Sequence, residues 1–126
     1  MRHGMTAGAI VLIALAAASA GAASTGDPGR GAVIYERCVG CHSIDYDRVG
    51  PHHRGLFGRP AGSVADFDYS DAMKRSGIVW SEATLDKFLT GPRGFVPGTR
   101  MGFAGIPDDQ ERADVIAYLK EATRPK

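Results

Sequence analysis

The sequence predicts an all-α domain with long loops, on the basis of three observations. Capped apolar stretches with helical spacing occur near both ends, the middle has no regular period, and no stretch alternates polar and apolar residues for long. Glycine (17) and proline (7) make up a large share of the 126 residues, which is typical of loop-rich chains. This length suits one domain rather than a multidomain enzyme.

Four helices are expected from caps and apolar spacing. Asp27 caps the first, with proline at the next position, Ser81 caps the third, and Asp108 caps the last. The third helix should stop at Gly91, which precedes a proline. The predicted helices cover about residues 28–39, 70–76, 82–90 and 109–122, and irregular structure is expected at 42–68 and 94–105.

The first twenty residues are typical of a secretory signal peptide. A short polar start precedes an apolar run at residues 7–18, and residues 18–20 are Ala-Ser-Ala, a suitable cleavage site. Cleavage as late as residue 23 fits as well. An uncleaved anchor is the weaker alternative, because this run falls short of the ~20 residues that span a bilayer. We therefore expect a domain over residues 21–126 in the periplasm.

Composition limits what the protein can do. With 15 Lys+Arg against 14 Asp+Glu, nucleic-acid binding through bulk positive charge is disfavoured. Two cysteines cannot build a multi-disulfide scaffold. Ordering a short chain so rich in glycine and proline costs much conformational entropy, and its apolar area is small. Something other than side chains is expected to complete the core.

Residues 38–42 are Cys-Val-Gly-Cys-His, the C-x-x-C-H pattern of covalent c-type haem attachment. Two thiols one helical turn apart can add to two neighbouring vinyl groups of a porphyrin, and the next imidazole can then bind the iron. The alternatives are a redox dithiol, which needs a βαβ context, and half of a zinc site, which needs two further ligands. The leader, the cysteine count and the small core favour haem.

Residues 28–124 resemble class I c-type cytochromes, the group of mitochondrial cytochrome c and bacterial cytochrome c2. This resemblance implies a cytochrome c fold, with crossing terminal helices and long loops wrapped around one covalently bound haem c. It also implies a one-electron carrier rather than an enzyme. The matching blocks are Cys38–His42, Gly50-Pro51 with Gly55–Arg59, Tyr69–Ala72, Gly77–Trp80, Val96–Gly105 and Arg112–Lys120.

The resemblance also assigns the haem site. His42 and Met101 are the implied axial iron ligands, which leaves no open position for a substrate, and Met73 is the other methionine of the mature chain. A haem enzyme or sensor with a vacant sixth position, and a module with a simple disulfide, remain the alternative functions. The other implied contacts are thioethers from Cys38 and Cys41, the Pro51 carbonyl on the His42 ring, propionate donors Arg59, Tyr69, Trp80 and Thr99, and Phe103 at the haem edge.

Two residues depart from the family pattern. Phe88 stands where the family usually has a tyrosine that bonds the methionine sulfur, which predicts a lower reduction potential. His53 stands at a usually apolar position, as a neutral packed side chain or as an alternative to Met101.

The resemblance implies redox complexes as partners, such as a quinol–cytochrome c reductase, a terminal oxidase or a photosynthetic reaction centre. We expect a monomer that binds no nucleic acid. Arg37, Lys87, Arg93 and Arg100 fall where the family surrounds its haem edge with positive charge. Because the net charge is near zero, docking to an acidic patch should depend on this local charge and weaken with salt.

Overall fold

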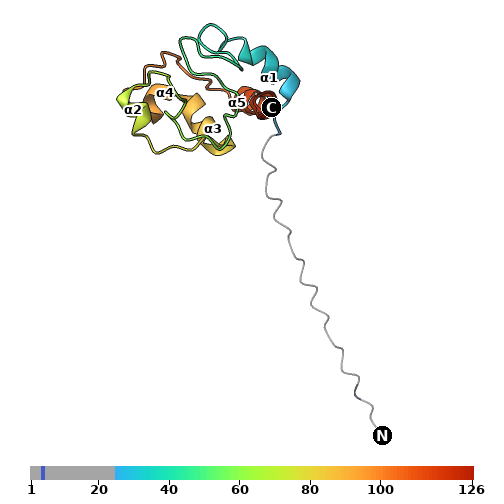
Figure 1. Cartoon of the computed structure of the whole chain (residues 1–126). Helices are drawn as coiled ribbons and strands as arrows, with labels where there is room; N and C mark the ends of the chain where they lie inside the picture. Colours follow the sequence, from blue (N-terminus) through green and yellow to red (C-terminus); the bar gives the residue numbers. More distant parts are fainter. Residues whose placement is uncertain (1–3, 5–24) are drawn as a thin grey trace.

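The computed structural model describes residue 4 and residues 25–126, so the predicted leader and its cleavage site lie outside the described residues, Gly4 apart. Figure 1 shows helices joined by long loops, and the sole β contact within these residues is an isolated bridge between Pro60 and Val79. The predicted all-α class is confirmed. The helices are α1 (Pro28–Tyr35), α2 (Asp71–Lys74), α3 (Glu82–Thr90), α4 (Pro92–Phe95) and α5 (Asp109–Ala122).

The predicted caps form. The Asp27 carboxylate accepts from the backbone N–H of Gly29 at 2.8 Å, and Asp108 accepts from that of Glu111 at 2.8 Å. Ser81 begins α3 in a capping box with Thr84. No helix in residues 25–126 is long and apolar enough to cross a membrane.

Two boundaries differ from the sequence-based expectation. The first helix ends at Tyr35 instead of continuing to residue 39, because the following amides bond three residues back, as Cys38 N–H does to the Tyr35 carbonyl at 2.8 Å. The segment expected to be loop after Gly91 begins with the short helix α4. Gly91-Pro92 both stops α3 and starts α4, since proline suits a first helical position as well as a helix end.

The terminal helices cross in direct backbone contact, as the resemblance implies. Figure 1 shows α1 against α5, with α2 and α4 at the other end of the domain. A Cβ on Gly31 would lie 2.0 Å from the carbonyl oxygen of Asp114, so no larger residue fits at the crossing without displacement. The rings of Tyr35 and Tyr118 meet beside it, with centroids 5.2 Å apart.

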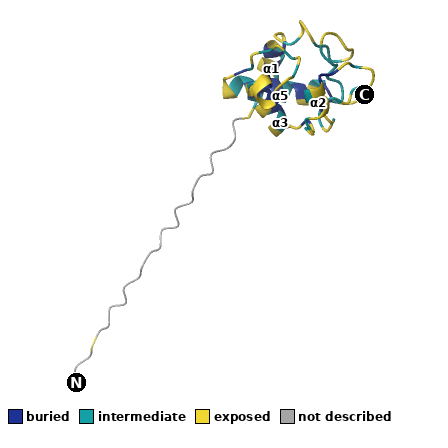
Figure 2. Cartoon of the chain, turned by 90° about the vertical axis from the view of Figure 1, so that its left-hand side faces the viewer, coloured by how far each residue is buried: buried dark blue, intermediate teal, exposed yellow. Residues whose placement is uncertain are grey.

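Buried polar groups hold this crossing together. The Asp114 carboxylate accepts from the backbone N–H of Asp27 at 2.7 Å and from the Arg30 guanidinium at 3.2 Å. Gln110 donates to the same carboxylate at 2.8 Å. Buried residues gather where the helices meet, and the outer faces of helices and loops are exposed (Figure 2).

The loop that follows the cysteines is tied to the end of α5. The Arg54 guanidinium donates to the carbonyls of Ala122 and Arg124 at 2.8 and 2.9 Å, and to the Asp45 carboxylate at 2.9 Å. The N–H of Gly55 donates to the carbonyl of Thr123 at 2.6 Å. These bonds hold this part of the irregular segment against the end of α5, and a cavity lies between it, α3 and the loop after α4.

Candidate functional site

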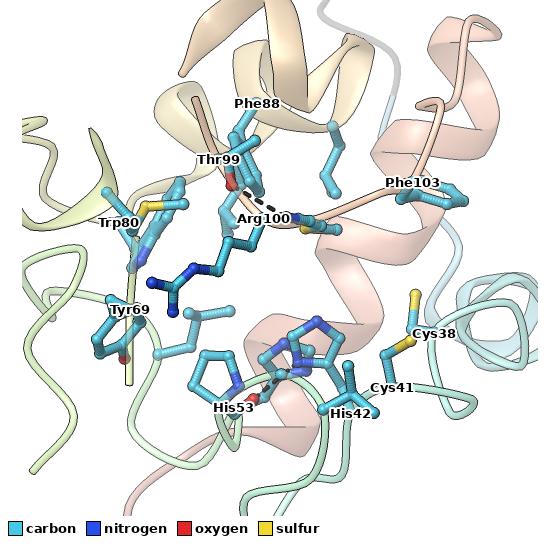
Figure 3. A pocket seen from close by; sticks show the side chains of 18 of the residues that line it. Cys38, Cys41, His42, His53, Tyr69, Trp80, Phe88, Thr99, Arg100 and Phe103 are labelled. Atoms are coloured by element: carbon cyan, nitrogen blue, oxygen red, sulfur yellow. Dashed lines mark hydrogen bonds between the residues drawn. The ribbon is translucent and has the colours of Figure 1, made fainter. Parts of the chain in front are cut away.

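A cavity of about 770 Å³ occupies the middle of the domain, a size suited to an organic ligand or cofactor. Its walls come from the cysteine segment, the following loop, α3, α5 and the loop after α4. All ten residues that the resemblance places around a cofactor line it: Cys38, Cys41, His42, Pro51, Arg59, Tyr69, Trp80, Thr99, Met101 and Phe103. Figure 3 shows how the labelled members of this set converge from different elements.

The cysteine segment leaves α1 as a series of tight turns. The N–H groups of Cys41 and His42 both donate to the carbonyl of Cys38, at 3.1 and 2.9 Å, which directs all three side chains to one wall of the cavity. Both cysteines are free. Burial raises the pKa of the Cys38 thiol to about 11, so this thiol stays protonated at neutral pH, unlike the activated thiolate of a redox dithiol.

The His42 ring is oriented by its neighbours. Its Nδ1 lies 2.7 Å from the Pro51 carbonyl oxygen, which can only accept, so Nδ1 carries a proton. Burial is the main cause that lowers the pKa of His42. The ring is therefore neutral at pH 7, with the lone pair of Nε2 free for a metal.

Two residues beside His42 were not assigned to it from the sequence. A Cβ on Gly50 would lie 2.2 Å from Cε1 of the His42 ring, so glycine is required for this approach. The His53 ring stacks on the His42 ring, and its Nδ1 lies 2.9 Å from the Tyr35 hydroxyl. His53 therefore takes the packed role of the two predicted alternatives, on the His42 side of the cavity.

The loop after α4 forms the opposite wall. In Figure 3, Thr99 lies across the cavity from His42, and the Met101 N–H donates to the Thr99 hydroxyl at 3.3 Å. The Arg100 guanidinium donates to the backbone carbonyl of Asp68 at 3.0 Å and anchors this loop. Met73 also lines the cavity, from α2, and is more deeply buried than Met101.

Polar donors gather at one end of the cavity. Arg59 is half-buried and donates to the carbonyls of His52 and Arg54 at 2.9 and 3.2 Å, and no carboxylate within residues 25–126 pairs with it. The guanidinium keeps its charge, although burial lowers its pKa. Tyr69 accepts from the Val64 N–H at 3.2 Å, which leaves its own O–H proton for another acceptor.

Trp80 adds a third donor at this end. Its indole N–H has no acceptor among the described side chains and backbone, and its ring packs on Phe88 with centroids 5.0 Å apart. A half-buried cation with two further donors fits an anionic group, such as the two carboxylates of a haem.

The remaining walls are apolar. One apolar face of α3 and one of α5 line the cavity. The helical spacing of these residues predicts that they are buried, but not that they face a cavity. The apolar lining residues that the sequence did not assign to the site include Val49, Leu56, Phe67, Leu85, Leu89, Ile106, Val115 and Leu119.

The donor set fits a c-type haem. Two thiols, an imidazole with a free Nε2, the Met101 thioether and an end rich in donors line one mainly apolar cavity. Zinc would need four ligands, and residues 25–126 contain no group of three or more His, Cys, Asp or Glu that could hold a metal ion.

Comparison with known proteins gives the same answer. The family model for cytochrome c matches residues 29–123. The chain belongs to the cytochrome c family. Cytochromes c are electron-transfer proteins rather than enzymes and bind one covalent haem c, so this chain is an electron carrier of the cytochrome c or c2 type. Its pair of cysteines has the spacing that covalent attachment needs.

Its relatives cover most of the chain. Cytochrome c2 of Rhodomicrobium vannielii is 48% identical over 104 residues, which are 80% of this chain and 83% of that protein. Cytochrome c of Theileria annulata is 48% identical over 102 residues, 78% and 88% of the two chains. Among solved structures, cytochrome cH from Methylobacterium extorquens superposes with a TM-score of 0.74 at 42% identity, covering 76% of this chain and 99% of that one. The predicted cytochrome c fold is confirmed.

Proposed function

We propose that this cytochrome c is a periplasmic one-electron carrier whose haem is held by Cys38 and Cys41 and ligated by His42 and Met101. The observation that carries the proposal concerns the loop after α4: Thr99 lies across the cavity from His42 (Figure 3), and Met101, whose N–H donates to the Thr99 hydroxyl at 3.3 Å, lines the same cavity. When bound, the haem supplies an iron that gains and loses one electron.

The chain's own residues prepare this site. The Pro51 carbonyl holds the proton on Nδ1 of His42 and so keeps Nε2 available as a ligand. A thioether on the other side is a soft ligand that favours ferrous iron and raises the potential. Arg59, Tyr69, Trp80 and Thr99 would bind the propionates, and Phe103 would line the haem edge. With both axial positions filled, no site is left for a substrate.

Partners are expected among redox complexes, such as a quinol–cytochrome c reductase, a terminal oxidase or a photosynthetic reaction centre. Within residues 25–126 the Arg37 charge is paired with Glu111 at 3.0 Å, whereas Lys87 and Arg93 have no ion pair. Arg48 lines the cavity as well, which the sequence did not indicate. Free positive charge near the haem edge should guide docking to an acidic surface, with an on-rate that falls as salt rises.

Periplasmic location rests on the leader of residues 1–20. N-terminal sequencing of the protein purified from a periplasmic extract tests it. A first residue between 21 and 24 supports export with cleavage, and a retained Met1 in the purified protein contradicts it.

Ligation is tested by visible spectroscopy of the haem-loaded protein. The ferric form should show the Met–iron charge-transfer absorption, and Met101→Ala should abolish it and allow carbon monoxide to bind. Met73→Leu is the matched control, because Met73 lines the same cavity from α2 and should leave the absorption in place. The reverse result, with the absorption lost only in Met73→Leu, would assign the ligand to Met73.

The same spectra test the haem-enzyme alternative. A vacant or easily displaced sixth position would appear as ready cyanide or carbon monoxide binding by the unmodified protein. A colourless protein would contradict both functions and favour the disulfide module.

A further inference from the structure

His53 has no part in the function proposed above, yet its contacts are specific. Its ring lies nearly parallel to that of His42, with centroids 4.3 Å apart and planes inclined by 23°. Its Nδ1 lies 2.9 Å from the hydroxyl of Tyr35 on α1. An aliphatic side chain at this position could fill the space but could make neither a stacked ring contact nor this hydrogen bond.

Tyr35 fixes the orientation of the His53 ring. The hydrogen bond restrains the ring whichever atom donates, and the Tyr35 ring meets it edge-on, with centroids 5.8 Å apart at 64°. Tyr35 is itself buried between α1 and α5, against Tyr118. His53 is therefore attached to the most tightly packed part of the fold rather than to its own loop alone.

Three neighbours together hold the His42 ring. The Pro51 carbonyl accepts from Nδ1, the backbone of Gly50 packs against Cε1, and His53 stacks on the ring. The bond from Nδ1 to Pro51 already limits rotation of the ring about its Cβ–Cγ bond, and the stacked His53 ring limits it further, because turning would break the face-to-face contact. Pro51 and His53 together restrain the plane of the His42 ring.

We propose that His53, held by Tyr35, is a positioning residue that sets the plane of the His42 imidazole and stabilises the oxidised state of the centre. The proposal rests on His42 being the iron ligand. A ligating imidazole carries more positive charge on ferric than on ferrous iron, and the π face of a stacked aromatic ring attracts positive charge. A leucine at position 53 would offer no such face, so the ferric state would lose stabilisation.

The test uses the haem-loaded full chain with His53→Leu, His53→Phe and Tyr35→Phe. Two quantities are measured: the reduction potential, and the pattern of haem methyl proton shifts in the ferric NMR spectrum, which depends on the plane of the axial imidazole. We expect His53→Leu to raise the potential and change the methyl pattern. His53→Phe keeps a stacked ring and should change both less. Tyr35→Phe removes only the hydroxyl and should change the methyl pattern slightly.

Tyr46→Phe is the matched control, because Tyr46 is 63% exposed and lies outside the cavity wall. It should change neither quantity. The proposal is overturned if His53→Leu leaves both quantities unchanged, or if His53→Phe changes them as much as His53→Leu does. Should His53→Leu fail to fold, an unchanged methyl pattern in Tyr35→Phe overturns the proposal.

The same samples separate this proposal from the proposed ligation. The Met–iron charge-transfer absorption reports whether both axial ligands are in place. If this absorption persists in His53→Leu while the methyl pattern and the reduction potential stay unchanged, the proposed ligation stands and the role of His53 is refuted. If the unmodified protein lacks it, the proposed function itself is refuted.

Discussion

The crossing of α1 with α5 and the loop wall around the cavity bury their residues in different ways. At the crossing, protein atoms are in direct contact, to the extent that a Cβ on Gly31 would lie 2.0 Å from a carbonyl oxygen of α5. The loop wall instead surrounds about 770 Å³ and presents to it donors from Arg59, Tyr69 and Trp80. At the crossing the two helices pack on each other, whereas the loops and the cavity-facing residues Val115 and Leu119 of α5 surround a space that haem would fill.

This difference has a thermodynamic consequence. A helix satisfies most of its backbone hydrogen bonds internally, whereas an irregular loop must find partners elsewhere and loses as much conformational entropy on ordering. In this cytochrome c several apolar side chains of the loops, such as Leu56, Phe67 and Ile106, line the cavity. The packing of the loops should therefore depend on the cofactor more strongly than the packing of the crossing does.

The largest expected effect comes from removing the cofactor. We expect Cys38→Ser/Cys41→Ser, made without haem, to lose the cooperative thermal transition seen by circular dichroism. An uncollapsed apolar cavity of this size would cost on the order of 10–20 kcal/mol at ~24 cal/mol per Å³. That is comparable with the whole stability of a domain, ~5–15 kcal/mol.

The single variant Cys41→Ser is its control, because Cys38 can still hold the haem covalently. It should keep a cooperative transition. A sharp transition in the haem-free double variant would show that the loops fold without the cofactor and would remove the contrast between the two regions.

The next largest effect is expected at the helix crossing. Gly31→Ala should lower the free energy of unfolding of the haem-loaded protein by about 3 kcal/mol, because the new methyl group overpacks the contact with Asp114. Gly94→Ala in α4 is the control, because it gives the same gain in helix propensity and its new Cβ would have no atom within 4 Å. It should leave the free energy of unfolding unchanged or raise it by up to ~1 kcal/mol. Denaturant titration measures both. Equal effects at the two positions would contradict the tight crossing.

A smaller effect, dependent on pH, is expected at Asp114. The backbone N–H of Asp27 and then the Gln110 and Arg30 side chains hold its pKa below the usual range. A carboxylate with a lowered folded-state pKa contributes stability above its unfolded pKa of ~3.9, and this contribution is lost as pH falls through the folded value. Asp114→Asn should therefore destabilise the haem-loaded protein at pH 7 by about 1–3 kcal/mol.

The difference between the unmodified protein and Asp114→Asn should narrow below about pH 4, as seen in thermal melting at several pH values. Asp108→Asn is the control, since asparagine caps a helix about as well as aspartate and should cost little at either pH. A difference that stays constant down to acid pH would mean that the charge on Asp114 is not what stabilises the crossing.

The smallest effect is expected inside the cavity. Phe88→Tyr should raise the reduction potential, because the new hydroxyl can bond the Met101 sulfur and reduce its donation to ferric iron. Phe95→Tyr, at a position outside the cavity wall, should leave the potential unchanged. Phe95→Tyr changes a residue at the surface, so it should alter the free energy of unfolding by no more than ~0.5 kcal/mol. A lowered or constant potential in Phe88→Tyr would contradict the role given to the missing hydroxyl.

Local chemistry allowed much of this protein to be predicted from its residues. The caps at Asp27, Ser81 and Asp108 act within three residues of themselves, so their helices began where expected. The end of α1 was wrong by four residues, because turns of the cysteine segment replace the last helical turn. The start of α4 was missed because proline after glycine is compatible with either a stop or a start.

Contacts between distant segments could not be predicted in this way. The pairing of Arg37 with Glu111 joins residues 74 apart, and with the ion pair of Arg100 and Asp68 at 3.2 Å it leaves two of the four expected basic residues, Lys87 and Arg93, without an ion pair in residues 25–126. The approach of Gly50 and the stacking of His53 on His42 depend on how the loop folds back on the cysteine segment. Helical spacing and caps concern residues close in sequence, so they do not predict contacts between such distant segments.

The sequence by itself determined the attachment chemistry, because the spacing of two thiols and an imidazole is a property of five consecutive residues. It also determined the helix starts, since a cap bonds its own first turn. Only the tertiary structure decided which side chains share the cavity, how the His42 ring is held and which charges remain unpaired. Those outcomes depend on contacts among segments far apart in the chain, and such contacts exist only after the loops have closed.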